Sequence, residues 1–226
     1  MTHYGQFCPV AKASEVLAER WTPLVLRELL SGSHRFNEIC RGVPLMSRSL
    51  LAKRLKELER AGVVERRRVV GQKVEEYHLS PAGEELRPVI EGLGVWGQRW
   101  IVRDLRDEDL DPSLLMWDIR RRLVREALPA ERVVVRFDFT GVEGPRRRWW
   151  LLVGGGEADI CMTDPGFEVG LAVTTSLRGL TGFWLGRRAW RDLAASGELH
   201  LDGPRWLQRS LPEWLARSLF APIPPA

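Results

Sequence analysis

The sequence predicts an α+β fold in two domains, and three observations support this fold class. Between residues 9 and 100, apolar side chains recur first at helical spacing and then alternate as in a β-hairpin. Beyond residue 112, segments with strand and helix patterns interleave. The chain has 226 residues, of which 44% are hydrophobic and 28% charged. This balance suits one large or two small globular domains and excludes a disordered, collagenous or disulfide-rich chain.

The distribution of charge and of tryptophan separates the two domains. Residues 1–102 contain 16 Lys and Arg against 12 Asp and Glu, whereas residues 103–226 contain 18 of each charge. The net charge of +4 therefore belongs to the first part, while seven of the ten tryptophans lie in the second. We expect a first domain at residues 1–102 and a second at residues 112–226, joined by a charged segment. The basic excess predicts an anionic partner for the first domain.

The first domain is expected to contain four helices, a hairpin and a closing helix. The predicted helices cover residues 9–19, 22–31, 35–40, 47–60 and 80–100, and the predicted strands cover residues 63–70 and 74–79. Ser47 is a typical N-terminal cap, and Gly71 lies in the loop between the strands. Helices in this order followed by a two-stranded ribbon are typical of a winged helix-turn-helix.

The second domain is expected to combine a sheet with helices. The predicted strands cover residues 132–139, 148–153, 157–163 and 167–174, and the predicted helices cover residues 114–128, 176–185, 188–195 and 206–219. Three glycines at residues 154–156 join two of these strands. They do not form a phosphate-binding loop, because no Lys-Ser/Thr follows them and they do not open a helix.

An ordered series of short motifs runs from residue 8 to about residue 100. It comprises Cys8-Pro9, Arg20-Trp21-Thr22, Leu26-Arg27-Glu28-Leu29, Arg35-Phe36-Asn37-Glu38-Ile39, Ser47, Arg54-Leu55-Lys56-Glu57-Leu58-Glu59, Gly62, Tyr77-His78-Leu79-Ser80-Pro81-Ala82-Gly83 and Trp96-Gly97. The series resembles the HxlR family of bacterial winged-helix transcription regulators. It departs from the family pattern at Ser80, where Thr is commoner, and at Glu19-Arg20, where the family often has Gly-Lys. The resemblance implies DNA binding and a homodimer on a pseudo-palindromic operator. Val95, Trp96 and Trp100 are candidates for the dimer contact.

The polar face of the predicted helix at residues 47–60 is the candidate DNA-binding surface. In a helix-turn-helix, the second helix enters the major groove with its N-terminal residues toward the base edges. Arg48 is expected to bind a guanine through two hydrogen bonds, and Lys53 to bind a base or a phosphate. The predicted DNA-contacting residues are Arg35, Ser47, Arg48, Ser49, Ala52, Lys53 and Lys56, with Arg66, Arg67, Arg68 and Lys73 of the wing. The alternative is a solvated face with internal pairs such as Arg54 with Glu57.

The three cysteines and four histidines are too scattered for a disulfide framework or a zinc site. We therefore expect no metal and no cofactor, and no catalytic group stands out. Cys8 precedes the first helix, where the HxlR resemblance implies the redox-sensing thiol of several members. The alternative is that Cys8 only packs. Cys40 and Cys161 are expected in apolar cores.

A second series of motifs lies in the second domain. It comprises Arg148-Trp149-Trp150-Leu151-Leu152-Val153, Glu157-Ala158-Asp159-Ile160-Cys161, the segment 167–174, Thr181-Gly182-Phe183-Trp184-Leu185-Gly186 and Ala194-Ala195-Ser196-Gly197-Glu198-Leu199-His200-Leu201-Asp202-Gly203. These motifs resemble the SCP2-like (sterol carrier protein 2-like) fold, which wraps an apolar cavity. The candidate pocket residues are Trp149, Leu171, Val173, Leu180, Phe183, Trp184, Trp190 and Leu215. The alternative is that the same side chains fill a packed core.

Together these inferences predict a bacterial transcriptional regulator and not an enzyme. We expect a homodimeric repressor that binds double-stranded DNA and senses a hydrophobic small molecule through its second domain. One alternative is a lipid or sterol carrier, or an enzyme on an apolar substrate, whose winged helix serves only dimerisation. Another is a second domain that acts as a rigid dimer brace. No signal segment and no run of about 18 apolar residues is present, so we expect a cytoplasmic protein without a membrane partner.

Overall fold

The structure is a computed structural model that describes residues 3–68, 71, 74–101 and 105–226. It divides into two compact units, Met1–Val95 and Trp96–Ala226. The first domain was expected to end at Val102, a residue that lies outside the described ranges.

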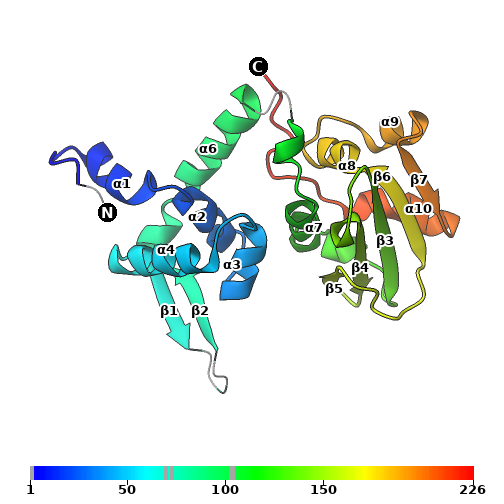
Figure 1. Cartoon of the computed structure of the whole chain (residues 1–226), viewed down its shortest axis with the longest axis horizontal. Coiled ribbons are helices and arrows are strands. Elements are labelled where there is room, and N and C mark those ends of the chain that lie inside the picture. The colour runs from blue at the N-terminus through cyan, green and yellow to red at the C-terminus, as the bar shows by residue number, and fades with distance from the viewer. Residues whose placement is uncertain (1–2, 69–70, 72–73, 102–104) are drawn as a thin grey trace. The chain divides into compact units, whose positions relative to one another are not determined.

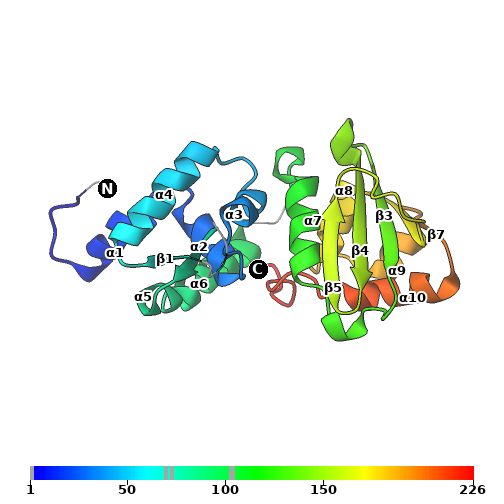
Figure 2. The same ribbon diagram turned by 90° about the horizontal axis from the view of Figure 1, so that it is seen from below.

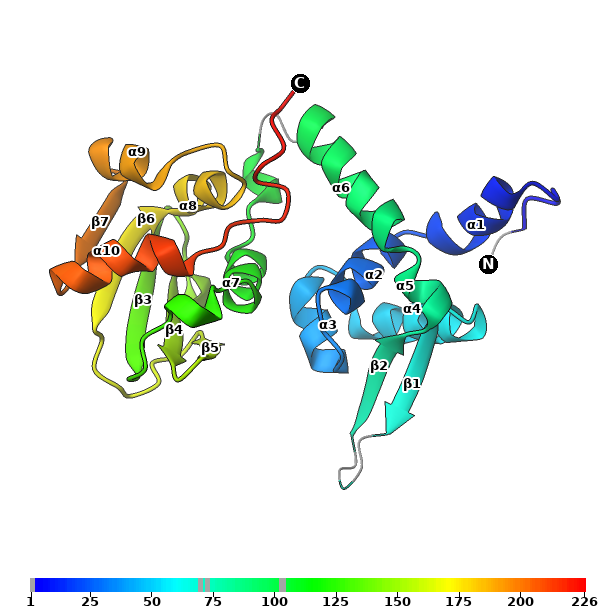
Figure 3. The same cartoon turned by 180° about the vertical axis from the view of Figure 1, so that it is seen from behind.

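The first unit contains the helices and the hairpin in the expected order (Figures 1 and 3). Its elements are α1 (Pro9–Leu17), α2 (Thr22–Leu30), α3 (Phe36–Gly42), α4 (Arg48–Arg60), β1 (Val64–Arg68), β2 (Glu75–Leu79), α5 (Pro81–Glu84) and the start of α6 (Arg87–Trp100). Ser47 caps α4, because its Oγ accepts a hydrogen bond of 3.3 Å from the backbone N–H of Leu50.

The closing helix is interrupted, in contrast to the single helix expected at residues 80–100. One helix, α5, ends at Glu84, and α6 begins at Arg87. Pro88 explains the break, because it has no N–H to donate to the carbonyl of Glu84 and its ring would crowd that carbonyl. The backbone N–H of Leu86 instead bonds to the carbonyl of Gly83 at 3.1 Å.

The core of the first unit forms where α2, α3 and α4 meet. Leu26 of α2, Ile39 of α3 and Leu51, Leu55 and Leu58 of α4 are at most 1% exposed. Full burial of such a side chain stabilises the fold by about 1.5–3 kcal/mol. Because these leucines occupy one face of α4, the opposite face of that helix is directed to solvent.

A buried arginine fixes α4 to the segment after α1. Nη1 of Arg54 donates to Oε2 of Glu57 at 2.6 Å, and its Nη2 donates to Oε2 of Glu19 at 3.2 Å. The side chain of Arg54 is only 8% exposed. The pairing of Arg54 with Glu57 that the sequence suggested is therefore present, and it includes a third, distant residue.

The wing is a two-stranded antiparallel sheet tied to the start of α3. β1 and β2 pair in the register that places Val64 opposite Leu79. The backbone N–H of Tyr77 donates to the carbonyl of His34 at 2.8 Å, so the residues before α3 extend the pairing. The rings of His34 and His78 stack there, with their centroids 4.2 Å apart.

The second unit is built on a five-stranded mixed sheet in the order β5-β4-β3-β6-β7 (Figure 2). Only β3 and β6 pair in parallel; the other neighbours are antiparallel. The elements are α7 (Pro112–Arg121), β3 (Val133–Thr140), β4 (Arg148–Gly154), β5 (Glu157–Cys161), β6 (Leu171–Ser176), α8 (Leu177–Trp184), α9 (Trp190–Ala195), β7 (Leu199–Asp202) and α10 (Arg205–Trp214). Short 3₁₀ turns lie at Asp107–Asp109, Arg125–Ala127 and Pro145–Arg147.

The two faces of this sheet differ in chemistry. On one face, Phe137 and Phe139 of β3 belong to the same core as residues of α8 and α10. Figure 3 shows these two helices on that side of the sheet. On the other face, Asp138 accepts hydrogen bonds from Arg148 at 2.6 Å and from Arg136 at 2.7 Å. Burial alone would raise the pKa of Asp138, but these two hydrogen bonds outweigh it and lower that pKa. We call the face of Asp138 the outer face.

Two helices of the second unit end earlier than expected. α7 ends at Arg121 and α10 at Trp214, whereas their apolar patterns continue to residues 128 and 219. The segments that follow them pair with each other: Leu123 and Leu215 form an antiparallel bridge, and the N–H of Val124 donates to the carbonyl of Trp214 at 2.9 Å. This tertiary pairing replaces the last turns of both helices.

Gly83 is a position where the fold leaves no room for a side chain. A Cβ there would collide with the carbonyl oxygen of Val63 and lie 2.9 Å from Cδ2 of Leu79. We expect Gly83→Ala to lower the free energy of unfolding by about 1–3 kcal/mol in urea denaturation. Gly92→Ala in α6 is the matched control: its Cβ meets open space, so we expect a gain of about 0.5–1 kcal/mol. Equal stability of Gly83→Ala and the wild type would contradict this packing.

Arg54 is expected to support the fold more than its exposed neighbour. Breaking a fully buried ion pair costs about 3–5 kcal/mol, but Glu19 is 34% exposed, so we expect Arg54→Ala to cost about 2 kcal/mol. Lys53→Ala on the same helix should change the free energy of unfolding by less than about 0.5 kcal/mol. Chemical denaturation of both variants measures the difference, and similar values would show that the buried pair does not hold α4.

Candidate functional site

The outward face of α4 gathers the polar residues expected at its N-terminal end. Ser47, Arg48, Ser49, Ala52, Lys53 and Lys56 are all exposed. The side chain of Ser47 is engaged in capping the helix. Short and basic side chains thus cover the first two turns, a surface that can approach the edges of base pairs.

Arg48 is held in place by α3. Its Nη2 donates to Oδ1 of Asn37 at 2.8 Å, and its guanidinium lies over the ring of Phe36, 5.0 Å from the centroid. Stacking and one hydrogen bond fix the plane of the guanidinium while other N–H groups stay available. Phe36 and Asn37 were not among the expected site residues, although they lie in the motif at residues 35–39 that carries the family resemblance.

Cys40 lies beside this arginine. Nη1 of Arg48 is 3.7 Å from Sγ of Cys40. Burial raises the pKa of the Cys40 thiol, and the positive charge of Arg48 opposes that shift only in part. A raised pKa keeps this cysteine in its less reactive thiol form.

The two lysines of the α4 face differ in their partners. Nζ of Lys53 is 4.0 Å from Oε1 of Glu57, an exposed pair of small energetic value. Among the described residues, no carboxylate forms an ion pair with Lys56. Both ammonium groups are therefore available to a phosphate.

The arginines of the wing are paired with acidic residues. Nη1 of Arg66 lies 3.0 Å from Glu75, and Nη2 of Arg67 lies 3.0 Å from Glu65. Nε of Arg68 is 4.0 Å from Glu75, and the Arg68 side chain is 90% exposed. Exposed pairs of this kind contribute about 0–1 kcal/mol, so a phosphate can compete for these arginines. Lys73 lies outside the described residues.

Two predicted functional residues, Arg35 and Cys8, lie outside α4. Arg35 precedes α3; its Nε is 3.4 Å from Oε1 of Glu76 in the wing. Cys8 precedes Pro9 at the start of α1 and is half-buried. The structure describes all three cysteines, and none of them forms a disulfide. The redox role of Cys8 stays a prediction.

The eight candidate pocket residues belong to the core of the second unit. Seven are at most 7% exposed, and Trp190 is half-buried, with its ring edge-on to Phe183 at 5.1 Å. All eight pack on the same face of the sheet as α8 and α10. None of them lines the pocket that the structure contains on the outer face.

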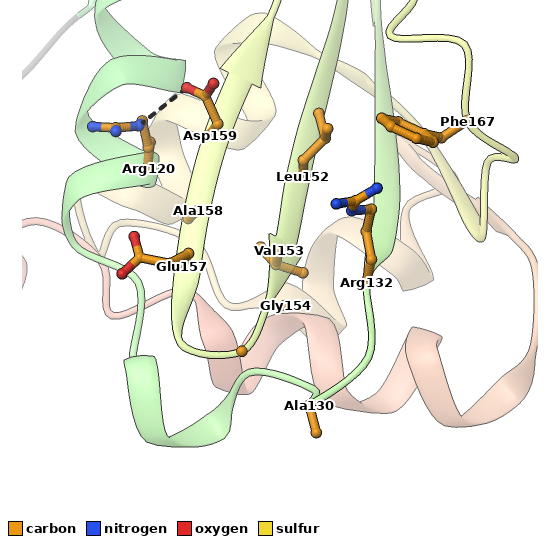
Figure 4. A pocket seen from close by; sticks show the side chains of 11 residues that line it. Arg120, Ala130, Arg132, Leu152, Val153, Gly154, Glu157, Ala158, Asp159 and Phe167 are labelled. Atoms are coloured by element: carbon orange, nitrogen blue, oxygen red, sulfur yellow. Dashed lines mark ion pairs between the residues drawn. The ribbon is translucent and has the colours of Figure 1, made fainter.

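That pocket is a groove of about 630 Å³ at one end of the outer face (Figure 4). It is lined by Arg120 of α7, Leu152, Val153 and Gly154 of β4, Gly155 of the turn after β4, Glu157, Ala158 and Asp159 of β5, and Ala130, Arg132 and Phe167 of the flanking loops. Figure 4 shows Leu152 in the middle, with Arg132 and Phe167 on one side and Arg120 and Asp159 on the other.

Clusters of metal-binding side chains and membrane-spanning helices are absent from the parts of the chain that the structure describes. No group of three or more His, Cys, Asp or Glu side chains could hold a metal ion there. Within the same ranges, no helix has the length and apolar character needed to cross a bilayer.

Comparison with known proteins gives relatives for the first unit. The family model "HxlR-like helix-turn-helix" matches residues 16–105, which end before the sheet of the second unit. The HTH-type transcriptional regulator YvaP of Bacillus subtilis is 38% identical over 49% of this chain and 96% of its own length. The regulator YodB of the same organism is 35% identical over 41% of this chain and 85% of its own length.

Among solved structures, the reduced form of YodB is 31% identical and covers 44% of this chain and 100% of its own, with a TM-score of 0.38. This structural likeness is low, whereas the sequence relatives are similar over most of their own length. They match a chain whose α3 and α4 form a helix-turn-helix with an exposed polar face. This chain therefore belongs to the HxlR family of DNA-binding transcriptional regulators.

Proposed function

We propose that this regulator binds a pseudo-palindromic operator as a homodimer and represses transcription, with α4 in the major groove. The main support for this proposal is that the first turns of α4 are exposed and basic. In such a complex, residues at the N-terminal end of α4 approach the bases while the wing approaches the phosphates.

Arg48 is the proposed base-reading residue. A guanidinium can donate two hydrogen bonds to O6 and N7 of guanine, and this contact discriminates against a wrong base by about 1–3 kcal/mol. The stack on Phe36 and the hydrogen bond to Asn37 support this role, because a side chain already ordered loses less entropy on binding. Ser49 and Ala52 are the proposed small neighbours that let α4 approach the groove closely.

Lys53, Lys56 and the arginines of the wing are the proposed phosphate contacts. Each neutralised phosphate adds about 0.9 to the slope of log affinity against log salt. Lys73 and Arg35 complete the proposed set, Lys73 from its place in the wing sequence and Arg35 from its position beside the wing.

The proposed dimer contact is a stripe of apolar residues along α6. Val89, Leu93, Trp96 and Trp100 recur at helical spacing and are 45% to 56% exposed. Large apolar side chains exposed in a row are typical of an interaction surface. Val95, which the sequence suggested for this contact, is half-buried instead.

For the second unit we propose an SCP2-like module that senses a hydrophobic small molecule. The mixed sheet with α8 and α10 on one face supports an α+β module of this kind. The tight packing of the eight candidate pocket residues favours the alternative of a rigid dimer brace, because a ligand in that core would have to displace them. Thermal-shift screening against apolar compounds separates the two roles, since only a sensor shows saturable stabilisation.

DNA binding by substituted chains tests the α4 interface. With an operator selected by the full chain from random DNA, Arg48→Ala should weaken specific binding about tenfold or more and change non-specific binding far less. Lys53→Ala and Lys56→Ala should each lower the salt slope by about one. Fluorescence anisotropy at several salt concentrations measures both quantities. Arg209→Ala, at an exposed site of α10, is the control. Unchanged affinity and sequence preference in Arg48→Ala would falsify the assignment.

The oligomeric state tests the α6 stripe. Leu93→Asp should convert a dimer into a monomer and weaken operator binding, because a carboxylate cannot be buried there without a partner. Light scattering after gel filtration measures the mass. Leu219→Asp, at a similarly exposed leucine, should leave the dimer intact. A Leu93→Asp chain that is still dimeric would assign the contact to another surface.

A further inference from the structure

The groove on the outer face has an apolar floor. Leu152 of β4 is half-buried and faces away from the core, because its neighbours Leu151 and Val153 point into it. Phe167 is 45% exposed at one wall of the groove. Figure 4 shows its ring and Leu152 on the same side of the sheet. These two side chains offer apolar surface to a flat ligand.

Each of the two carboxylates of the groove has an arginine nearby. Asp159 lies 3.6 Å from Nε of Arg120, and Glu157 lies 3.7 Å from Nη1 of Arg125. Arg120 also stacks on Trp117, 5.1 Å from the ring centroid. The acidic wall of the groove therefore contributes little net charge to a ligand.

Arg132 is the uncompensated charge. Its guanidinium lies over the ring of Phe167, with Cζ 4.6 Å from the centroid. No ion pair links it to any carboxylate of the described residues. Stacking fixes the plane of the guanidinium and leaves its N–H groups free to form paired hydrogen bonds with a planar anion.

We propose that this groove binds a small monoanion with a flat apolar body, such as an aromatic carboxylate. The carboxylate would accept hydrogen bonds from Arg132, and the apolar body would lie over Leu152 beside Phe167. The volume of about 630 Å³ is in the usual range of small-molecule sites. The site lies on the opposite face of the sheet from the candidate pocket residues.

An effect of this ligand on DNA binding rests on the proposed sensor role of the second unit. Binding of the ligand to the groove does not depend on that role. Binding to the groove is measured without DNA, so the two proposals can fail separately. The probes are 2-naphthoate and its neutral isostere 2-naphthamide, each titrated into the full chain by isothermal calorimetry at constant ionic strength. We expect one 2-naphthoate per chain, and an affinity for 2-naphthamide at least about tenfold lower.

Three variants locate the binding. Arg132→Gln should weaken 2-naphthoate about tenfold or more and leave 2-naphthamide nearly unchanged. Leu152→Glu places a carboxylate on the floor of the groove and should also weaken the binding of 2-naphthoate relative to the wild type. Arg147→Gln is the matched control, because Arg147 is also exposed, forms no ion pair among the described residues and does not line the groove. Thermal unfolding confirms that each variant is folded.

The proposal is overturned if 2-naphthoate does not bind at concentrations up to about 5 mM. It is also overturned if the two probes bind with equal affinity, or if Arg132→Gln binds 2-naphthoate as tightly as the wild type does. Loss of binding in Arg147→Gln to the same extent as in Arg132→Gln would assign the effect to overall charge and also overturn it.

Discussion

The arrangement of the first unit depends on the burial of one face of α4. Leu51, Leu55 and Leu58 are almost fully enclosed by α2, α3 and the wing strands. A rotation of the helix about its axis would expose these leucines and bury charged groups, and each change would cost several kcal/mol. The same constraint therefore fixes the core and decides which residues reach solvent. The helical period of about 3.6 residues in the sequence predicts both the buried and the exposed face of α4, because the polar residues occupy the positions between the leucines.

Arginines that look alike in the sequence do different work because their partners differ. Arg54 is buried between two carboxylates and acts as a tether, whereas Arg48, two turns earlier, is exposed and held by an amide and a ring. Hydrogen bonding to a neutral amide leaves the charge of Arg48 uncompensated, while the carboxylates cancel the charge of Arg54. A polyanion is therefore attracted to Arg48 and gains little from Arg54. The wing arginines are intermediate, since their carboxylate partners are exposed and easily exchanged.

The helices and the hairpin of the first unit could be predicted because each has a local signal, such as the cap at Ser47 or the apolar period of α4. The break between α5 and α6 also had a local signal, Pro88, which the apolar period concealed. The early end of α7 and α10 had none, since it depends on a bridge between Leu123 and Leu215, residues far apart in the sequence. The same limit applies to the sites. The outward positions of α4 follow from periodicity, but the contact of Arg48 with Asn37 and the groove beside Arg132 depend on tertiary proximity.

The two faces of the second sheet separate stability from recognition. On the core face, tryptophans and phenylalanines are packed closely, and a ligand there would need a cavity that costs contacts on every side. On the outer face, several charged groups pair with one another: Asp138 binds Arg136 and Arg148, and Asp159 lies beside Arg120. Arg132 departs from this rule, because it stacks on an aromatic ring instead of pairing with an acid. An unpaired arginine beside an apolar floor lowers the stability of the fold little as long as water solvates its charge. When an anion replaces that water, the same guanidinium can form charge-assisted hydrogen bonds with it. Recognition on this unit is therefore expected where the pairing of charges stops and not where aromatic residues are most numerous.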